Sequence, residues 1–389
     1  MDQRPLKIAF IIPYFYPAWQ YGGQPRAAYD LARGLVRRGH DVRVITTDSA
    51  GRSRLDPLAV GAVSDRGFFA SRVDGIEVFY YKNLSNGLAY RQRLCLPLGL
   101  RADIHRQLQD RDIIHIHELR STPSVIGSSA AKALKKPYVL SGHGGLRRLG
   151  RRSVKTVFDA VWGKRILEEA SAIVAVSPVE EQDAHDIGVE ECRIHKLPNA
   201  IDIDEYKDLP SRRPRPRPLI LFLGRLHHIK GVDILIEAFG LARERSLEAD
   251  LLIAGPDDGE ETNLRALVRK RGLESYVTFA GYLDRQAKLQ AFVDSTVTVI
   301  PSRSEVFALT ALESLMCGTP VILSSACGLF PMPGPDEGVT RFKTGDISEL
   351  ADMLLCDHQK SIFESWVRQH FAVNRIAEQA EWLYRQLIL

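Results

Sequence analysis

The chain has 389 residues, of which 45% are hydrophobic and 26% are charged, and this balance is typical of a soluble globular protein. Its length exceeds that of one ordinary core and predicts two domains of about 150 to 200 residues each. The formal net charge of +4 at pH 7 is too small for this length to indicate a dedicated nucleic-acid binder.

Apolar runs along the chain are the length of strands, and none approaches the ~20 residues of a membrane helix. The run near the amino terminus is cut at Pro13, too early for a signal peptide, so we expect a cytoplasmic protein. The cysteines are odd in number and form no CxxC pair, which indicates neither a disulfide framework nor a zinc site. They are Cys95, Cys192, Cys317, Cys327 and Cys356.

A strand, a glycine-containing loop and a helix are predicted at the start of the chain. Residues 6–12 have the pattern of a buried strand, and the helix that follows ends at Gly39, before a second strand at residues 41–46. The loop at residues 22–26 reads GGQPR rather than GxGxxG, so the dinucleotide fingerprint is absent. Two glycines before a helix allow the backbone to approach an anion, although a tight turn would also require them.

The next predicted elements are a strand at residues 76–81 and an amphipathic helix at residues 100–108. Residues 112–118, DIIHIHE, form a predicted strand whose alternation places His115 and His117 on one side. An HxH pair can bind a metal, but no third ligand lies at a characteristic spacing. A structural or hydrogen-bonding role is therefore favoured for these two histidines.

Another predicted strand, residues 137–140, leads into Ser-Gly-His-Gly-Gly, which contains His143. The flanking glycines would let this imidazole project from the carboxyl end of the strand, although it could also be a loop histidine bonded to backbone. Residues 147–165 then combine arginines and lysines with interleaved apolar residues. This segment could lie on an anionic membrane surface or bind an anionic, lipid-linked acceptor, or it could be one face of a packed helix.

A change of composition marks the boundary between the predicted domains. After a strand at residues 172–176, Ser177 and Glu180 form the pattern of a capping box. Residues 208–218 read DLPSRRPRPRP, which cannot form a core and is typical of a linker. The predicted divisions are a first domain at 1–205, a linker at 206–218, a second domain at 219–370 and a carboxyl-terminal helix at 371–389 that returns to the first domain.

The second half begins again with a strand (219–223), a loop (224–231) and a helix (232–243). Arg225 and Lys230 lie in this loop between glycines, where an arginine fork and a lysine point charge are suited to neutralise a diphosphate. Alternating strands and helices then complete a parallel α/β domain. The strands are predicted at 251–254, 277–280, 296–300 and 321–323, and the helices at 260–271, 285–293 and 308–316.

Two carboxylates stand eight positions apart around the start of the last of these helices. Glu305 lies in the preceding loop and Glu313 about one to two turns along, so both could face the crevice at the carboxyl end of the strand. Free amides of the first turn, around Leu309 and Thr310, would favour a phosphate in the same space. This combination suits a sugar nucleotide, although the two glutamates could also be solvated surface charges.

The ordered set of these motifs resembles the retaining, nucleotide-sugar-dependent glycosyltransferases of the GT-B fold, in glycosyltransferase family 4. The motifs are Gly224-Arg225, Lys230-Gly231, the E-x7-E pair and Cys317-Gly318-Thr319-Pro320. The resemblance extends over nearly the whole chain. It implies an α/β protein with two Rossmann-like domains, whose mainly parallel sheets face an interdomain cleft.

The resemblance also implies roles for the candidate site residues. Arg225 and Lys230 would bind the donor diphosphate and stabilise the leaving group, while Glu305 would hold the hydroxyls of the donor sugar and Glu313 those of the ribose. His143 matches the active-site histidine near the transferred sugar. The remaining implied donor contacts are the Gly22-Gly23 loop and the amides near Leu309 and Thr310 at the diphosphate, and Gly281 and Tyr282 at the base.

One segment departs from the family pattern. The family commonly has two glycines and a glutamate after the Cys-Gly-x-Pro strand, whereas residues 324–333 read SSACGLFPMP. This difference leaves open which contacts to donor or acceptor the loop makes, and therefore which sugar is used.

The implied reaction moves a sugar from a nucleoside diphosphate, UDP or GDP, to an acceptor hydroxyl with retention, and it requires no metal or other cofactor. The acceptor would be a glycan or a lipid-linked molecule of polysaccharide or lipid-linked glycan synthesis, bound mainly by the first domain. Peripheral contact with the inner face of the membrane through residues 147–165 is compatible with this. The alternatives are a GT-B epimerase or phosphorylase, or a sugar-nucleotide sensor or membrane-surface scaffold without transferase activity.

Overall fold

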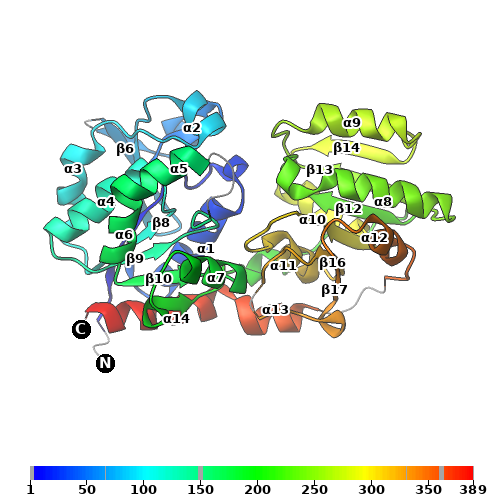
Figure 1. Cartoon of the computed structure of the whole chain (residues 1–389). Coiled ribbons are helices and arrows are strands. Elements are labelled where there is room, and N and C mark those ends of the chain that lie inside the picture. The colour runs from blue at the N-terminus through cyan, green and yellow to red at the C-terminus, as the bar shows by residue number, and fades with distance from the viewer. Residues whose placement is uncertain (1–3, 66, 148–151, 330, 359–362, 389) are drawn as a thin grey trace. The chain divides into compact units, whose positions relative to one another are not determined.

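A computed structural model of the chain describes residues 4–65, 67–147, 152–329, 331–358 and 363–388 (Figure 1). It separates into two compact units. Unit 1 comprises Met1–Ala200 and Val373–Leu389, and unit 2 comprises Ile201–Ala372. The predicted boundaries at 205 and 370 differ from these by a few residues.

Unit 1 is built on a sheet with the strand order β11-β10-β9-β8-β1-β2-β7-β6-β5. The strands from β11 to β7 pair in parallel, and β6 and β5 continue the sheet antiparallel. The strands are β1 (Lys7–Ile11), β2 (Asp41–Thr47), β5 (Val63–Asp65), β6 (Phe68–Val73), β7 (Ile76–Tyr81), β8 (Ile113–His117), β9 (Tyr138–Ser141), β10 (Ala172–Ala175) and β11 (Ile194–Lys196). A separate ribbon pairs β3 (Ser49–Ala50) with β4 (Ser53–Arg54).

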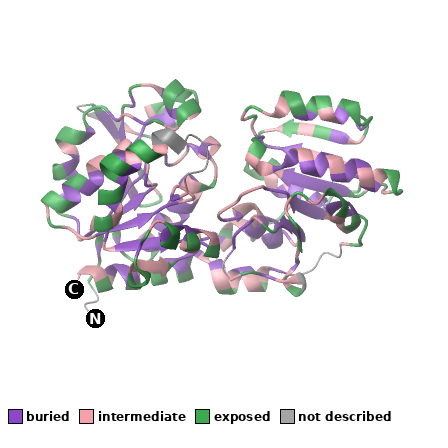
Figure 2. Cartoon of the chain, in the orientation of Figure 1, coloured by how far each residue is buried: buried purple, intermediate pink, exposed green. Residues whose placement is uncertain are grey.

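Unit 1 also contains helices, most of which connect these strands. They are α1 (Gly23–Arg37), α2 (Asn86–Gln92), α3 (Leu100–Leu108), α4 (Thr122–Ala133), α5 (Arg152–Phe158), a π-helical turn (Asp159–Gly163), α6 (Lys164–Glu169), α7 (Pro178–Asp186) and α14 (Val373–Ile388). The central parallel strands are buried, as Figure 2 shows in purple. Such strands are buried on both faces, which explains the continuous apolar character of the run around His115 and His117.

The carboxyl-terminal helix α14 packs on α1 within unit 1 (Figure 1). At Gly34 of α1, an added Cβ would lie 2.8 Å from Cβ of Ala377, so the absence of a side chain lets the two helices approach closely. Arg38 also donates a 2.7 Å hydrogen bond to Glu381. The predicted return of the last helix to the first domain is confirmed.

Unit 2 contains a wholly parallel sheet with the order β14-β13-β12-β15-β16-β17. The strands are β12 (Leu219–Leu223), β13 (Asp250–Ala254), β14 (Val277–Gly281), β15 (Val297–Ile300), β16 (Val321–Ser324) and β17 (Val339–Phe342). The helices are α8 (Val232–Glu244), α9 (Glu261–Lys270), α10 (Arg285–Asp294), α11 (Leu309–Met316), α12 (Ile347–Leu354) and α13 (Glu364–Phe371). Because β12 lies between β13 and β15, the loops that follow these three strands are neighbours at the carboxyl edge.

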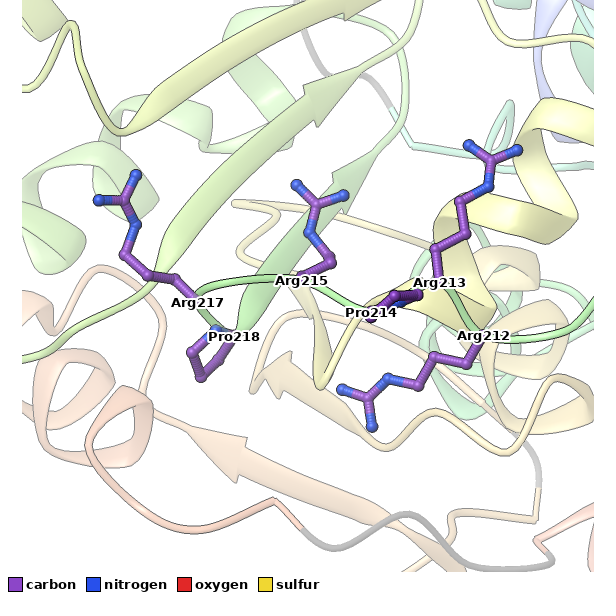
Figure 3. A pocket seen from close by; sticks show the side chains of 6 residues that line it. All are labelled: Arg212, Arg213, Pro214, Arg215, Arg217 and Pro218. Carbon is purple, nitrogen blue, oxygen red and sulfur yellow. The ribbon is translucent and has the colours of Figure 1, made fainter.

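The segment predicted as a linker, residues 206–218, belongs to unit 2. Its backbone is tied to α10, since the amide of Arg213 donates to Asp294 at 2.8 Å and Gln290 donates to the carbonyl of Ser211 at 3.0 Å. Arg217 pairs with Asp250 at 2.7 Å. An open pocket of about 450 Å³ runs along this segment. Figure 3 shows the side chains of Arg213, Arg215 and Arg217 pointing to one side of the chain.

Candidate functional site

The loop after β12 lies directly against the end of β15. A 3-10 turn at His228–Lys230 leads to Gly231, whose φ of +66° is in the left-handed region. A Cβ at Gly231 would lie 2.1 Å from the carbonyl oxygen of Pro301, which follows β15. The glycine of the Lys230-Gly231 motif is therefore required both by its backbone conformation and by the neighbouring strand end.

The structure brings Lys230 and Glu305 together from positions 75 residues apart. The Nζ atom of Lys230 donates to the carboxylate of Glu305, and their side chains are 20% and 19% exposed. Arg225, in the same loop as Lys230, instead pairs with Asp258 from the loop after β13. The three predicted residues thus lie on adjacent strand ends, with Lys230 and Glu305 in direct contact.

Arg303 connects the loop after β15 to the loop after β12. It was not predicted from the sequence. Its backbone amide donates to the carbonyl of Ile229 at 2.8 Å, and its guanidinium donates to the carbonyl of His228 at 2.9 Å. The same guanidinium holds Asp233 of α8 at 2.7 and 2.5 Å. Burial of Asp233 opposes its ionisation, but the hydrogen bonds from Arg303 outweigh this and lower its pKa. Arg303 therefore braces the backbone that carries Lys230.

Glu305 is held on its other side by the loop that departs from the family pattern. Its amide donates to the carbonyl of Ala326 at 3.1 Å, and the amide of Gly328 donates to the carbonyl of Glu305 at 2.8 Å. The hydroxyl of Ser324 also donates to the carbonyl of Ser302 at 2.6 Å. Of the departing segment, Phe330 lies outside the described residues. The rest supports the backbone of Glu305, and any contact it makes to a donor or acceptor stays a prediction.

Glu313 has different partners from Glu305. Lys288 of α10 donates to its carboxylate at 2.6 Å, and the hydroxyl of Tyr206 donates to it at 3.4 Å. Lys288 was not identified from the sequence, because its position on a polar helix gives no signal of this contact. Helix α11 begins at Leu309 and Thr310, and its N-cap residue Ala308 supplies no side-chain hydrogen bond.

Gly281 and Tyr282 lie at the carboxyl end of the edge strand β14. Gly281 has a φ of +66°, and its carbonyl accepts a 2.7 Å hydrogen bond from the amide of Gly255. The side chain of Tyr282 is exposed. This exposure is compatible with the predicted contact to a base, which stays a prediction.

In unit 1, His143 follows β9 and has a left-handed φ of 48°. Its Nε2 atom shares a 2.9 Å hydrogen bond with Nδ1 of His117, whose ring stacks on that of His115. His115 in turn contacts the hydroxyls of Tyr384 at 2.6 Å and Ser141 at 2.7 Å. Burial lowers the pKa of His143 to about 4 and that of His115 to about 3, so these imidazoles are uncharged at pH 7.

Glu118, directly after β8, is a second candidate that the sequence analysis passed over. It has a left-handed φ of 77°, and burial raises the pKa of its carboxyl to about 7. Gln24, in the first turn of α1, donates to it at 3.4 Å. Gly22, with a φ of 99°, and Gly23 precede Gln24, so the glycine loop and the β8 end that carries Glu118 are linked within unit 1. The sequence contains a signal for this residue, because Glu118 is the last residue of DIIHIHE and so follows a predicted buried strand.

Residues 148–151 of the basic segment lie outside the described residues. In the remainder, Val157, Val161 and Trp162 are 62%, 55% and 44% exposed. Lys164 and Arg165 pair with Glu168 and Glu169 of the next turn. In the part of the chain that the structure describes, the helices do not combine the length and the hydropathy of a transmembrane span.

One surface group of unit 1 could hold a metal ion. Within the described ranges, ligand atoms of Glu181, His185 and Glu191 lie within 4.8 Å of one another. Lys196 already pairs with Glu181 at 2.8 Å, which would compete with a cation there. This group is remote in sequence from every candidate donor-binding residue and was not predicted as a site.

Comparison with known proteins identifies families for both halves of the chain. The family model described as Glycosyltransferase Family 4 matches residues 21–205, and that described as Glycosyl transferases group 1 matches residues 206–354. An uncharacterised glycosyltransferase of Methanocaldococcus jannaschii is 26% identical over 83% of this chain and 82% of its own length. A D-inositol 3-phosphate glycosyltransferase of Acidothermus cellulolyticus is 29% identical over 79% of this chain and 71% of its own.

Solved structures share the fold at low sequence identity. Anabaena HepE in complex with UDP has a TM-score of 0.74 at 19% identity, with 98% of this chain and 100% of that chain covered. Sucrose-phosphate synthase of Thermosynechococcus elongatus has a TM-score of 0.71 at 21% identity, with 98% of each chain covered. With two family models that adjoin over residues 21–354, and with this fold, the chain belongs to glycosyltransferase family 4 and has the GT-B fold.

Proposed function

We propose that the chain transfers a sugar from a nucleoside diphosphate to an acceptor hydroxyl, with retention at the anomeric carbon. The observation that carries this proposal is the contact between Lys230 and Glu305 at adjacent strand ends of unit 2. A cation beside a carboxylate offers one group to a diphosphate and one to sugar hydroxyls. Ligands bind at this edge of open parallel sheets.

Charge builds on the departing diphosphate during such a transfer, and fixed cations lower the barrier where this charge develops. In the proposal Lys230 and Arg225 supply these cations, and the start of α11 adds its free amides. Lys230 would exchange its present partner, Glu305, for the diphosphate, which frees the carboxylate for the sugar. Because these residues provide the positive charge, we also propose that the reaction needs no added metal, which activity retained in a chelator would support.

For the transfer step we propose attack from the same face as the leaving group. The acceptor oxygen would bond to the anomeric carbon as the bond to the diphosphate breaks, and an oxygen of the leaving phosphate would take the acceptor proton. His143 would line the sugar site in its uncharged form, in keeping with its lowered pKa. The trapping of a covalent glycosyl-enzyme would refute this step.

We propose that the donor is a sugar linked to UDP or GDP. The Anabaena structure described above contains UDP, which favours UDP-sugars as the first donors to test. Relatives include proteins named D-inositol 3-phosphate glycosyltransferase and mannosylfructose-phosphate synthase, and both names contain a phosphorylated compound. The acceptor panel should therefore include phosphorylated polyols and sugars beside glycans and lipid-linked sugars.

The test is a donor screen followed by product analysis. We expect one nucleoside diphosphate sugar among the UDP, GDP and ADP series to stabilise the folded chain by about 2.7 kcal/mol at 100 times its dissociation constant. With that donor and a matching acceptor, proton NMR should show a product with the anomeric configuration of the donor. An inverted product would contradict retention. A change in the configuration of the donor sugar without transfer would indicate an epimerase. Release of a sugar phosphate would indicate a phosphorylase, and binding of the donor without turnover would indicate a sensor.

We also propose that residues 147–165 contact an anionic membrane surface, where a lipid-linked acceptor would be found. The exposed side chains of Val157, Val161 and Trp162 support this, since apolar groups beside basic residues are typical of interfacial segments. In a sedimentation assay, the protein should pellet with vesicles of anionic lipid. Trp162→Ser should lower the affinity for these vesicles several-fold. Equal retention of the variant, or none of either protein, would exclude this contact.

A further inference from the structure

A fully buried carboxylate lies beside the His143 loop and is not used by the chemistry proposed above. Glu180 is in the first turn of α7 and is 0% exposed. Buried carboxylates are costly unless hydrogen bonds satisfy them, so the partners of this group indicate why it is retained.

The two oxygens of Glu180 accept backbone hydrogen bonds from two different strand ends. Oε1 accepts from the amide of Gly144 at 2.8 Å, and Oε2 accepts from the amide of Val176 at 3.2 Å. Gly144 adjoins His143 after β9, and Val176 directly follows β10. A capping box would return this side chain to the amide of Ser177. Instead, Glu180 bridges the carboxyl ends of two neighbouring strands.

The glycine before His143 makes room for this carboxylate. A Cβ at Gly142 would lie 2.7 Å from Oε1 of Glu180. A side chain at this position would push the carboxylate away from Gly144. The glycine at position 142 therefore allows Glu180 to approach the backbone of this loop.

We propose that Glu180 is a positioning residue, whose ionised carboxylate ties the backbone directly after His143 to the end of β10 and so holds the histidine in the orientation needed for sugar transfer. The inference rests on the proposed function, because His143 is given its role there. Glu180 acts through the loop and touches neither substrate nor reacting atoms.

The protonation state of Glu180 decides whether both hydrogen bonds can form. An ionised carboxylate accepts from both amides, whereas a protonated one presents a hydroxyl donor to one of them. Burial raises the pKa of Glu180 to about 7, against the lowering effect of the two amides, and Asp183 raises it further. Both hydrogen bonds to the loop and to β10 therefore form at a pH above this pKa. One of them is lost as the pH falls through it.

Few other charges face this carboxylate. Asp183, on the same helix, is paired with Arg147 at 2.5 Å. His143 is uncharged at neutral pH. Arg120 is engaged by Asp159 at 2.7 Å and by the carbonyl of Leu146 at 3.2 Å. Glu118 titrates in the same pH range, so only a substitution of Glu180 itself can assign an effect to it.

Stability and activity should respond in opposite directions. A carboxyl whose folded pKa lies above its unfolded value of 4.5 destabilises the fold once ionised. This destabilisation is absent below pH 4.5, grows between 4.5 and about 7, and is complete above that. At pH 8.5, Glu180→Gln should therefore leave the thermal midpoint unchanged or raise it, so a loss of activity would not come from unfolding.

The test compares Glu180→Gln with the wild type from pH 6 to pH 9. We expect kcat of the variant to fall by about tenfold at pH 8.5 and to lose the part of its pH dependence near 7 that comes from Glu180, while nucleotide binding is unchanged. Asp183→Asn is the matched control and should keep the pH dependence with a lower midpoint. Gly142→Ala should reproduce the loss of kcat by displacing the carboxylate. A normal kcat in Glu180→Gln at pH 8.5, or a pH dependence near 7 that is the same as in the wild type, would overturn the inference.

A second readout does not need activity. The amide NMR signal of Gly144 should shift with a midpoint near pH 7 in the wild type and stay constant in Glu180→Gln. A Gly144 signal that does not titrate in the wild type would also overturn the inference. If this signal titrates but no donor supports transfer, the proposed function fails while the contact between Glu180 and the loop stands.

Discussion

Lys230→Ala is expected to lower turnover by about 100-fold or more, because one cation aimed at developing charge contributes a few kcal/mol to the transition state. The loss should appear in kcat, since the charge on the diphosphate increases as the bond breaks. Steady-state kinetics with the donor identified by screening would measure it. Arg225→Ala should give a loss of similar size.

The control for this substitution removes a positive charge from an exposed position elsewhere in unit 2. Arg245 follows α8 and forms an exposed pair with Asp352. Arg245→Ala should therefore leave kcat within about twofold, because exposed pairs contribute little. A near-normal rate in Lys230→Ala would show that the pair with Glu305 is structural.

Gly231→Ala is expected to destabilise unit 2 by about 2 to 5 kcal/mol. About 1 to 2 kcal/mol comes from placing a Cβ on a left-handed backbone, and about 1 to 3 kcal/mol more comes from overpacking. The carbonyl of Pro301, 2.1 Å from the added Cβ, is backbone and cannot rotate away as a side chain would. Denaturant unfolding would measure the change in free energy.

Gly272 provides a matched control for the backbone conformation. Its φ of +65° is nearly that of Gly231, but no atom lies within 4 Å of an added Cβ. Gly272→Ala should therefore cost only the conformational part, about 1 to 2 kcal/mol. Equal losses in the two variants would mean that the contact with Pro301 carries no energy.

The elements of both units were largely predictable, because buried parallel strands and capped helices have strong local patterns. The strands at 76–81 and 219–223 and the helix at 100–108 have the predicted limits. The predicted neighbourhood of Lys230 and Glu305 followed from the rule that the carboxyl ends of parallel strands share one edge.

The residues that brace the site were not predictable, since their partners are distant in the sequence and their local patterns suggest other roles. Arg303 looks like an ordinary loop charge, yet it holds Asp233, 70 residues away. Glu180 has the pattern of a helix cap, and only the fold brings Gly144 within reach of its carboxylate. The 206–218 segment has the composition of a linker, but its backbone hydrogen bonds join it to α10.

The central claim is that Lys230 and Arg225 bind the diphosphate of a nucleotide sugar. Its most direct test is calorimetric titration of the wild type, Lys230→Ala and Arg225→Ala with a nucleoside diphosphate and with the matching monophosphate. We predict that the wild type binds the diphosphate at least about tenfold more tightly, a difference of about 1.4 kcal/mol, and that each variant loses most of this preference. A wild type without the preference, or variants that keep it in full, would contradict the claim.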